Sequence, residues 1–181
     1  MSASPPGWRA GGRLRLAGAE RTVATVLRGW EELGGRRTEW VWAFLDDGGL
    51  LEVAPRGWRL YTSHRVLLPG AEGYLQLAAP DGALARFERR VRAGRDEAEP
   101  TVVTLGGREY RVVATGNANV ARDGPPPALG AWSGLGDDAG ENVYFVLADV
   151  ETGEEVLGLW TRAVCLSFGR ALRSEDVPAP G

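Results

Sequence analysis

Short apolar runs separated by glycine turns fill the first half of the chain. Residues 13–16 alternate between polar and apolar side chains, and residues 22–27 are rich in β-branched side chains. Residues 39–45 are almost all apolar or aromatic, as in a strand buried on both faces. Turn signals at Gly34-Gly35 and at residues 46–49 divide these runs. The pattern predicts a meander of four or five antiparallel strands.

The second half has the same kind of pattern. Further strands are expected at five places, at 101–105, 109–114, 142–147, 155–160 and 163–168. Between the second and third of them lies a long glycine- and proline-rich loop from Arg122 to Gly140. A loop of this length is unusual within a compact domain and often has a function.

The middle of the chain permits two interpretations. Residues 74–77 read as a strand, and Pro80-Asp81-Gly82 is a strong turn signal. Residues 83–95 fit a strand that follows this turn, which is the interpretation favoured here. A helix stays open, because helical spacing also fits three apolar residues of the segment, Leu84, Phe87 and Val91.

The two halves resemble each other in sequence. Residues 16–23 align with residues 105–112, with Leu, Gly, Glu and Val at matching places, and residues 42–47 align with residues 144–149. Such an echo predicts an internal duplication.

The predicted fold class is therefore all-β, built of two related antiparallel units in a pseudo-duplicated arrangement. The units are expected to be half-barrels or packed sheets. The first spans residues 13–95 and the second residues 101–176. Residues 1–12 and 177–181 are expected to be flexible ends.

Several segments also resemble a known family. Residues 107–120 are similar to the G-x-x-Y-x-v-x-x-x-G-x-A-x-V line of the bacterial DUF4178 family, and Gly124-Pro125-Pro126 resembles its next segment. Residues 166–172 resemble its closing aromatic-G-x-x-L motif. Residues 40–45 lack the acidic pair of the family's corresponding strand. The resemblance covers roughly residues 13–176 and implies a β-rich fold, with no established activity to carry over.

Composition narrows the function classes. All 21 basic residues are Arg, and the net charge is −3, so no strong field attracts nucleic acid. The single cysteine, Cys165, excludes an internal disulfide and fits a reducing compartment. No secretory signal and no apolar run long enough to span a membrane is present. The expected location is the cytoplasm, without direct membrane insertion.

Candidate catalytic groups are few. His64 is the only histidine, and Ser63 or Ser167 would have to accompany it, but no nucleophile-elbow glycines surround it. Cys165 lies in an apolar run and reads as a buried side chain. One His and one Cys cannot form a zinc site of the usual ligand number. Asp46-Asp47 and the acidic group at residues 137–141 lack the spacing of a calcium loop. We expect no metal, no cofactor and no catalytic residue.

Aromatic and arginine side chains supply the candidate binding residues. Trp132 lies in the long loop, where an exposed aromatic side chain would serve as an anchor for a partner, and Trp30 lies in a second loop, residues 28–37. Arginines gather between residues 86 and 95, and the binding candidates among them are Arg86, Arg89 and Arg90. They would hold a phosphate, a polyanion or an acidic patch. The simpler interpretation is a solvated face balanced by nearby acidic residues.

These observations favour a non-enzymatic binding or scaffold module whose partner is a protein. The alternative is a small-ligand-binding protein or a hydrolase-like enzyme that uses carboxylates and arginines at the junction of the two halves, with Asp47 and Asp149 as first suspects. A third option is homo-oligomerisation through an edge strand.

Overall fold

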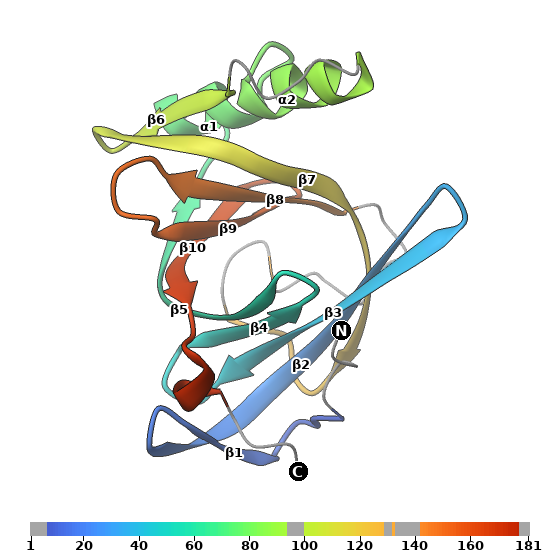
Figure 1. Cartoon of the computed structure of the whole chain (residues 1–181), viewed down its shortest axis with the longest axis vertical. Helices are drawn as coiled ribbons and strands as arrows, with labels where there is room; N and C mark the ends of the chain where they lie inside the picture. Colours follow the sequence, from blue (N-terminus) through green and yellow to red (C-terminus); the bar gives the residue numbers. More distant parts are fainter. Residues whose placement is uncertain (1–6, 94–99, 129–131, 133–141, 178–181) are drawn as a thin grey trace.

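Ten strands and two short α-helices make up the computed structural model, which describes residues 7–93, 100–128, 132 and 142–177 (Figure 1). The strands of the first half are β1 (Arg13–Leu16), β2 (Ala19–Leu33), β3 (Arg36–Leu45), β4 (Leu50–Ala54) and β5 (Gly57–Leu67). Those of the second are β6 (Val102–Leu105), β7 (Arg108–Asp123), β8 (Asn142–Asp149), β9 (Glu155–Trp160) and β10 (Val164–Ala171). The helices are α1 (Glu72–Ala78), α2 (Ala83–Arg92) and the 3-10 helix η2 (Ser174–Asp176).

Eight of the strands close into an antiparallel barrel in the order β2-β3-β4-β5-β10-β9-β8-β7. The barrel closes because β2 pairs with β7, from Val26 opposite Asp123 to Trp30 opposite Asn119. Strands β1 and β6 each extend this sheet by a hairpin. The predicted β-rich, antiparallel class is confirmed, but both halves supply strands to one barrel.

Alternation along the strands decides which side chains fill the barrel. On β3, Trp40, Trp42 and Phe44 belong to the cluster inside the barrel, whereas Val41 and Ala43 belong to a cluster on its outer face. Every barrel strand contributes to the inner cluster. The interior is thus a packed aromatic core, as expected for a barrel of this strand number.

Two separate clusters cover the outer surface of the barrel. The helices α1 and α2 pack over strands of the second half, where Leu77 and Leu84 join the core residues of β6 to β10. On the first half, β1 and the N-terminal Trp8 cover β2 and β3. Figure 1 shows the helices and β1 at opposite ends of the molecule.

The middle of the chain corrects the sequence-based prediction. Residues 74–77 and 83–92, expected as strands, lie in α1 and α2. Pro80-Asp81-Gly82 turns the chain between two helices, and the Arg86 N–H bonds to the Gly82 carbonyl at 3.0 Å. Residues 83–92 form a helix and not a strand because the helix buries Leu84 and places the arginines on the solvent side.

The N-terminal segment is attached to the barrel. Residues 7–12 were expected to be a flexible end, but the Gly11 N–H bonds to the Val23 carbonyl at 2.8 Å. Trp8 packs edge-to-face on Trp58 with ring centroids 5.4 Å apart. Residues 1–6 and 178–181 of the predicted ends lie outside the described residues.

Candidate functional site

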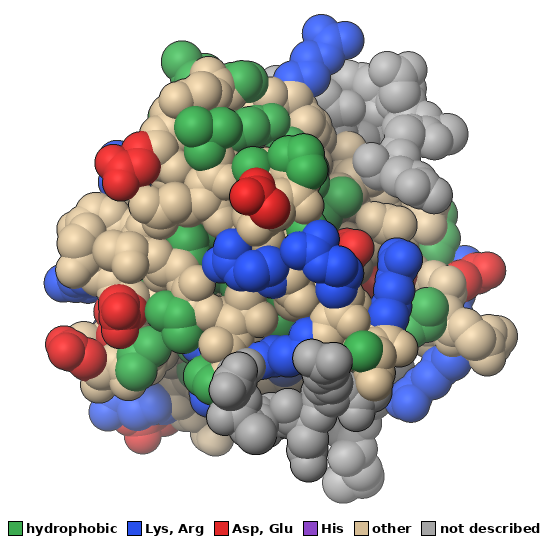
Figure 2. All heavy atoms as spheres, turned by 90° about the horizontal axis from the view of Figure 1, so that it is seen from above, with side chains coloured by type: hydrophobic (Ala, Val, Ile, Leu, Met, Phe, Trp, Pro, Cys, Tyr) green, Lys and Arg blue, Asp and Glu red, His purple; other side chains and the backbone are tan. Residues whose placement is uncertain are grey.

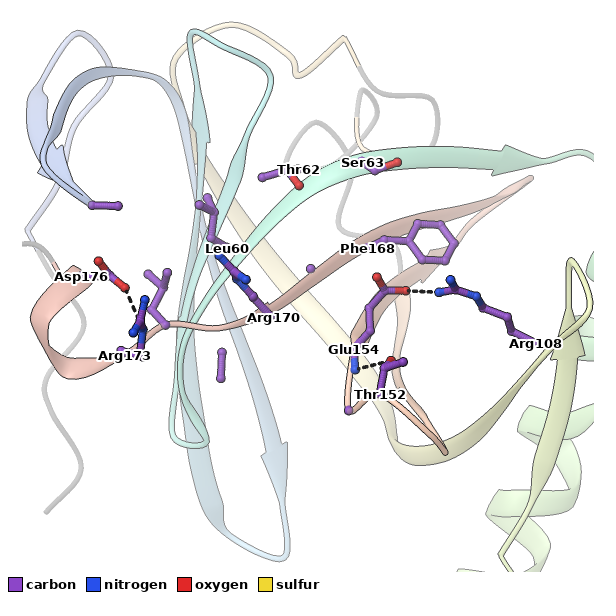
Figure 3. A pocket seen from close by; sticks show the side chains of 15 residues that line it. Leu60, Thr62, Ser63, Arg108, Thr152, Glu154, Phe168, Arg170, Arg173 and Asp176 are labelled. Atoms are coloured by element: carbon purple, nitrogen blue, oxygen red, sulfur yellow. Dashed lines mark hydrogen bonds and ion pairs between the residues drawn. The ribbon is translucent and has the colours of Figure 1, made fainter.

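An open groove of about 760 Å³ runs along the outer face where β5 meets β10, between the two halves of the chain (Figure 3). Its apolar lining comes from Leu60, Phe168 and Leu172. Hydroxyl groups are added by three residues, Thr62, Ser63 and Thr152. Charged side chains complete it, namely Arg108, Arg170, Arg173, Glu154 and Asp176.

A β-bulge forms the floor of the groove. The register of β10 on β5 shifts between Phe168 and Gly169, so that Phe168 lies opposite Ser63 and Gly169 opposite Tyr61. A Cβ atom at position 169 would overlap the backbone of Leu60 and Tyr61. Glycine is therefore required at this point of the β5–β10 pairing, and the bulge redirects the neighbouring side chains.

The arginines of the groove differ in how they are paired. Arg173 interacts with Glu175 at 3.2 Å and Asp176 at 3.5 Å, and Arg108 lies 3.6 Å from Glu154. The side chain of Arg170 is exposed and makes no ion pair or hydrogen bond with any part of the chain that the structure describes. In the view of Figure 3, Arg170 lies between the two paired arginines.

Asp149 anchors the turn at one end of this groove. Its carboxylate accepts backbone N–H bonds from Thr152 at 2.7 Å and Glu151 at 2.8 Å. These bonds, the Thr152 bond foremost, lower the pKa of Asp149 against the opposing effect of desolvation. The charged carboxylate fixes the turn that carries Thr152 and Glu154.

A second polar cluster lies inside the barrel. Glu52 accepts hydrogen bonds from Trp42 Nε1 at 3.2 Å, from the Tyr61 hydroxyl at 2.9 Å and from Arg56 at 2.5 Å. Arg56 also donates to Glu155 at 2.9 Å. Burial, followed by the Glu52 charge, raises the pKa of Tyr61 well above its usual value, so its hydroxyl remains a donor.

Arg59 completes this inner cluster. It donates through Nε and Nη2 to the two oxygens of Glu155, the second bond being 3.0 Å long. Arg56 and Arg59 thus neutralise two glutamates, Glu52 from the first half of the chain and Glu155 from the second. Because these groups bond to each other, the cluster is a structural junction.

His64 and Ser167 do come together. His64 Nδ1 lies 2.9 Å from Ser167 Oγ, and its Nε2 lies 2.9 Å from the Gly48 carbonyl. Ser167 is fully buried, so its hydroxyl is out of reach of a substrate. The pair ties the β3–β4 turn to β10.

The two aspartates suspected as catalytic groups, Asp47 and Asp149, each stabilise a different turn. Asp47 caps the β3–β4 turn, accepting the Gly49 N–H at 3.1 Å, and forms an ion pair with Arg21. Asp149 caps the β8–β9 turn, as described above. Cys165 is buried in the barrel, as its apolar neighbours indicated.

Trp132 is not the exposed anchor that was expected. Its side chain is fully buried, and it packs inside the barrel against Trp42 and Phe44. The mistake lay in equating a loop position with exposure, since a long connection can return a side chain to the core. Trp30 does not lie in a loop, because residues 28–37 belong to β2 and β3 except for the Gly34-Gly35 turn. Its side chain is half-buried, with the Arg37 guanidinium 5.0 Å from its ring centroid.

The predicted arginine candidates lie on α2 and do not line the groove. Figure 2 views the molecule from the side on which Figure 1 draws the helices, and arginine side chains gather on the face it shows. Arg86 donates to the carbonyl of Asp81 at 2.8 Å, and Arg89 to that of Pro80 at 3.4 Å. The Arg90 guanidinium lies 5.3 Å from the Phe87 ring centroid. Arg86 and Arg89 therefore tie the helix to the preceding loop, while Arg95 lies outside the described residues.

Sequence reasoning missed Arg170, Arg108 and the inner cluster. Phe168-Gly169-Arg170 was noted only as part of a family motif, and no spacing rule links β5 to β10. Pairing between the two halves can be read only from the closed barrel.

The described residue ranges contain neither a membrane-spanning helix nor a metal-binding group. They contain no helix long and apolar enough to cross a membrane. Nor do their His, Cys, Asp and Glu side chains form a group that could hold a metal ion. The acidic group at residues 137–141 lies outside those ranges. Comparison with protein-family models, with curated proteins and with solved structures gave no match to this chain.

Proposed function

We propose that the protein is a non-enzymatic binding module that holds an extended acidic segment of a partner protein in the groove between β5 and β10. The observation that carries this proposal is Arg170, an exposed guanidinium without a partner among the described residues, in the middle of the groove. A guanidinium binds a carboxylate through two parallel hydrogen bonds, which gives both affinity and orientation.

The neighbours of Arg170 suit a peptide. The side chains of Phe168 and Leu60 offer apolar surface beside it, and Thr62 and Ser63 offer hydroxyls for backbone groups. The groove is open along the surface, so an extended chain can enter without rearrangement of the barrel. Three arginines against two acidic residues leave the lining positively charged, which favours an acidic ligand.

Fluorescence anisotropy with a labelled Glu-Leu-Glu-Leu-Glu peptide tests the proposal. We expect Arg170→Ala to weaken binding at least five-fold, and added salt to weaken binding to the wild type. Arg162→Ala is the matched control, because Arg162 is exposed and does not line the groove. Equal affinity of wild type and Arg170→Ala contradicts the proposal.

A competition experiment with the same labelled peptide distinguishes the proposed peptide-binding function from the alternative, a small-ligand-binding protein. If free glutamate displaces the peptide at concentrations near those of the peptide itself, the groove recognises a single carboxylate-bearing molecule. The proposal expects free glutamate to compete only at far higher concentration, because it lacks the apolar and backbone contacts of an extended segment.

An internal duplication is also proposed. Strands β1–β5 and β6–β10 follow the same hairpin order, and the register shifts between Val23 and Thr25 in β2 and between Val112 and Ala114 in β7. Val23 and Val112 are the residues that the sequence echo aligns. These matches support the proposal that one five-stranded unit was repeated and closed on itself.

A further inference from the structure

Strand β10 continues beyond the end of its neighbour β9. The pairing of β10 with β9 ends where Gly169 lies opposite Glu155. The pairing of β10 with β5, on its other side, goes on through Arg170 and Ala171. Among the described residues, one edge of β10 therefore has no strand beside it at Arg170 and Ala171.

The backbone of Ala171 places hydrogen-bonding groups on this open edge. The Leu172 N–H donates to the Trp58 carbonyl on β5 at 2.9 Å. Because successive residues of an antiparallel strand turn their N–H and carbonyl groups to opposite sides, those of Ala171 point away from β5. Ala171 is exposed, and these two groups make no hydrogen bond within the described ranges. Such groups at a strand edge are the ones that pair with an added strand.

The groove that contains Arg170 runs along the same edge (Figure 3). Every residue of the chain from Phe168 to Arg173 contributes to its lining. Gly153 of the β8–β9 turn also lines it, and a Cβ atom built there would meet no other described residue within 4 Å. The open edge of β10 and the Arg170 guanidinium thus border one unfilled space.

Resting on the function proposed above, we propose that the acidic segment binds as an additional antiparallel strand on the open edge of β10, bonded to the N–H and the carbonyl of Ala171. The strand pairings of the described barrel are antiparallel as well. The segment residue opposite Ala171 supplies the backbone bonds, and its two neighbours place their side chains on the face that carries the Arg170 side chain. The partner is therefore an extended segment with acidic side chains at every second position.

N-methylation of the peptide backbone separates strand addition from attraction of charge. Two derivatives of the labelled Glu-Leu-Glu-Leu-Glu peptide are compared with the parent by fluorescence anisotropy, one methylated at both leucine nitrogens and the other at those of the second and third glutamates. The leucines lie opposite Ala171 in the proposed strand, so we expect their methylation to weaken binding about ten-fold, because a backbone bond is lost. The glutamate N–H groups point away from β10, so their methylation should leave the affinity near that of the parent.

The outcomes distinguish strand addition from the function on which it rests. If Arg170→Ala weakens binding of the parent peptide but both methylated peptides bind as the parent does, the proposed function stands and strand addition is overturned. A greater loss from methylation of the glutamates also overturns strand addition. Absence of binding by the parent peptide contradicts both proposals.

Substitution of Ala171 tests the same contact from the side of the protein. Proline is tolerated at a strand edge whose N–H faces solvent, but it lacks that donor. We expect Ala171→Pro to bind the parent peptide about ten-fold more weakly than the wild type, and the control Ala171→Val, which keeps the N–H, to bind like the wild type. Equal affinities of the two variants contradict the proposal.

Amide hydrogen exchange replaces this comparison should Ala171→Pro lose its cooperative unfolding transition. In the wild type, we expect saturating parent peptide to slow exchange of the Ala171 amide, because the proposed strand accepts its hydrogen bond. An exchange rate at Ala171 that the bound peptide leaves unchanged overturns the proposal.

Discussion

Arg59 on β5 and Glu155 on β9 join the two halves of the chain inside the barrel. The Arg59 Nη2 donates to Glu155 Oε1 at 3.0 Å, and Arg56 donates to the other oxygen at 2.9 Å. The two strands do not pair with each other, since β10 lies between them. The ion pair therefore bridges a strand and fixes the relative position of the two halves beneath the groove.

Glu155→Gln removes the negative charge shared by Arg56 and Arg59 with little change of shape. We expect it to lower the free energy of unfolding by about 3 kcal/mol, because the buried Arg59 guanidinium loses its counter-charge, while Arg56 keeps its ion pair with Glu52. Urea denaturation at unchanged m-value measures the effect. Arg13→Gln is the control, since the Arg13–Glu20 pair is exposed and should change stability by less than about 1 kcal/mol. Equal effects of the two substitutions would refute the account of the junction.

Gly169→Ala tests the bulge that forms the floor of the groove. The added methyl group would overlap the backbone of Leu60 and Tyr61, so we expect a loss of about 2 kcal/mol or more. Gly7→Ala is the matched control, because no atom lies within 4 Å of a Cβ placed there. A Gly169→Ala protein with wild-type stability would show that β5 and β10 are not in the close register described.

Alkaline pH should destabilise the protein through Tyr61, which is buried, and Tyr144, which is half-buried. Burial raises the pKa of Tyr61 and of Tyr144 above the usual value of 10.0. Their contribution is fully present below pH 10 and is lost as pH rises above it, because the unfolded chain releases these protons first. The slope approaches about 1.4 kcal/mol per pH unit for the buried Tyr61 and is smaller for the half-buried Tyr144, whose charge the solvent screens.

Urea titrations between pH 9 and 11 measure this slope. Tyr144→Phe should make the decline shallower, since it removes one of the tyrosines whose pKa is raised. A stability that is flat across this range, or a slope identical in Tyr144→Phe, would count against the burial of these hydroxyls.

Acid pH should lower the stability of the protein through protonation of Asp149. Its pKa is lowered by the N–H groups of Thr152 and Glu151, so its contribution is present above the usual value of 3.8. That contribution is lost as pH falls through the lowered pKa. Asp149→Asn keeps the turn's acceptor oxygen but cannot titrate, so stability measured between pH 2 and 5 should depend less on pH than in the wild type. The same dependence in both proteins would argue against this role of the turn.

Strand positions were readable from the sequence because apolar runs between glycine turns carry a local signal. Trp40 and Trp42 share the inner face, as their spacing requires. The helix α2 was mistaken for a strand because the short segment fits both periods: Leu84, Phe87 and Val91 have helical spacing, and Ala85, Phe87, Val91 and Ala93 have strand spacing.

The candidate site was out of reach of such reasoning. Arg170 and Ser63 are more than 100 residues apart in sequence, and only the pairing of β5 with β10 brings them to one groove. The prediction that Trp132 is exposed was wrong for a different reason. Its local sequence indicates a surface loop, but its side chain fills a space that exists only once the barrel is closed.

The most direct test of the central claim is a map of amide chemical-shift changes in the labelled protein on addition of the acidic peptide. The account predicts shifts at Arg170, Phe168, Ser63 and Thr152, with α2 unaffected. Shifts confined to Arg86, Arg89 and Arg90 on α2, or no shifts at all, would contradict it.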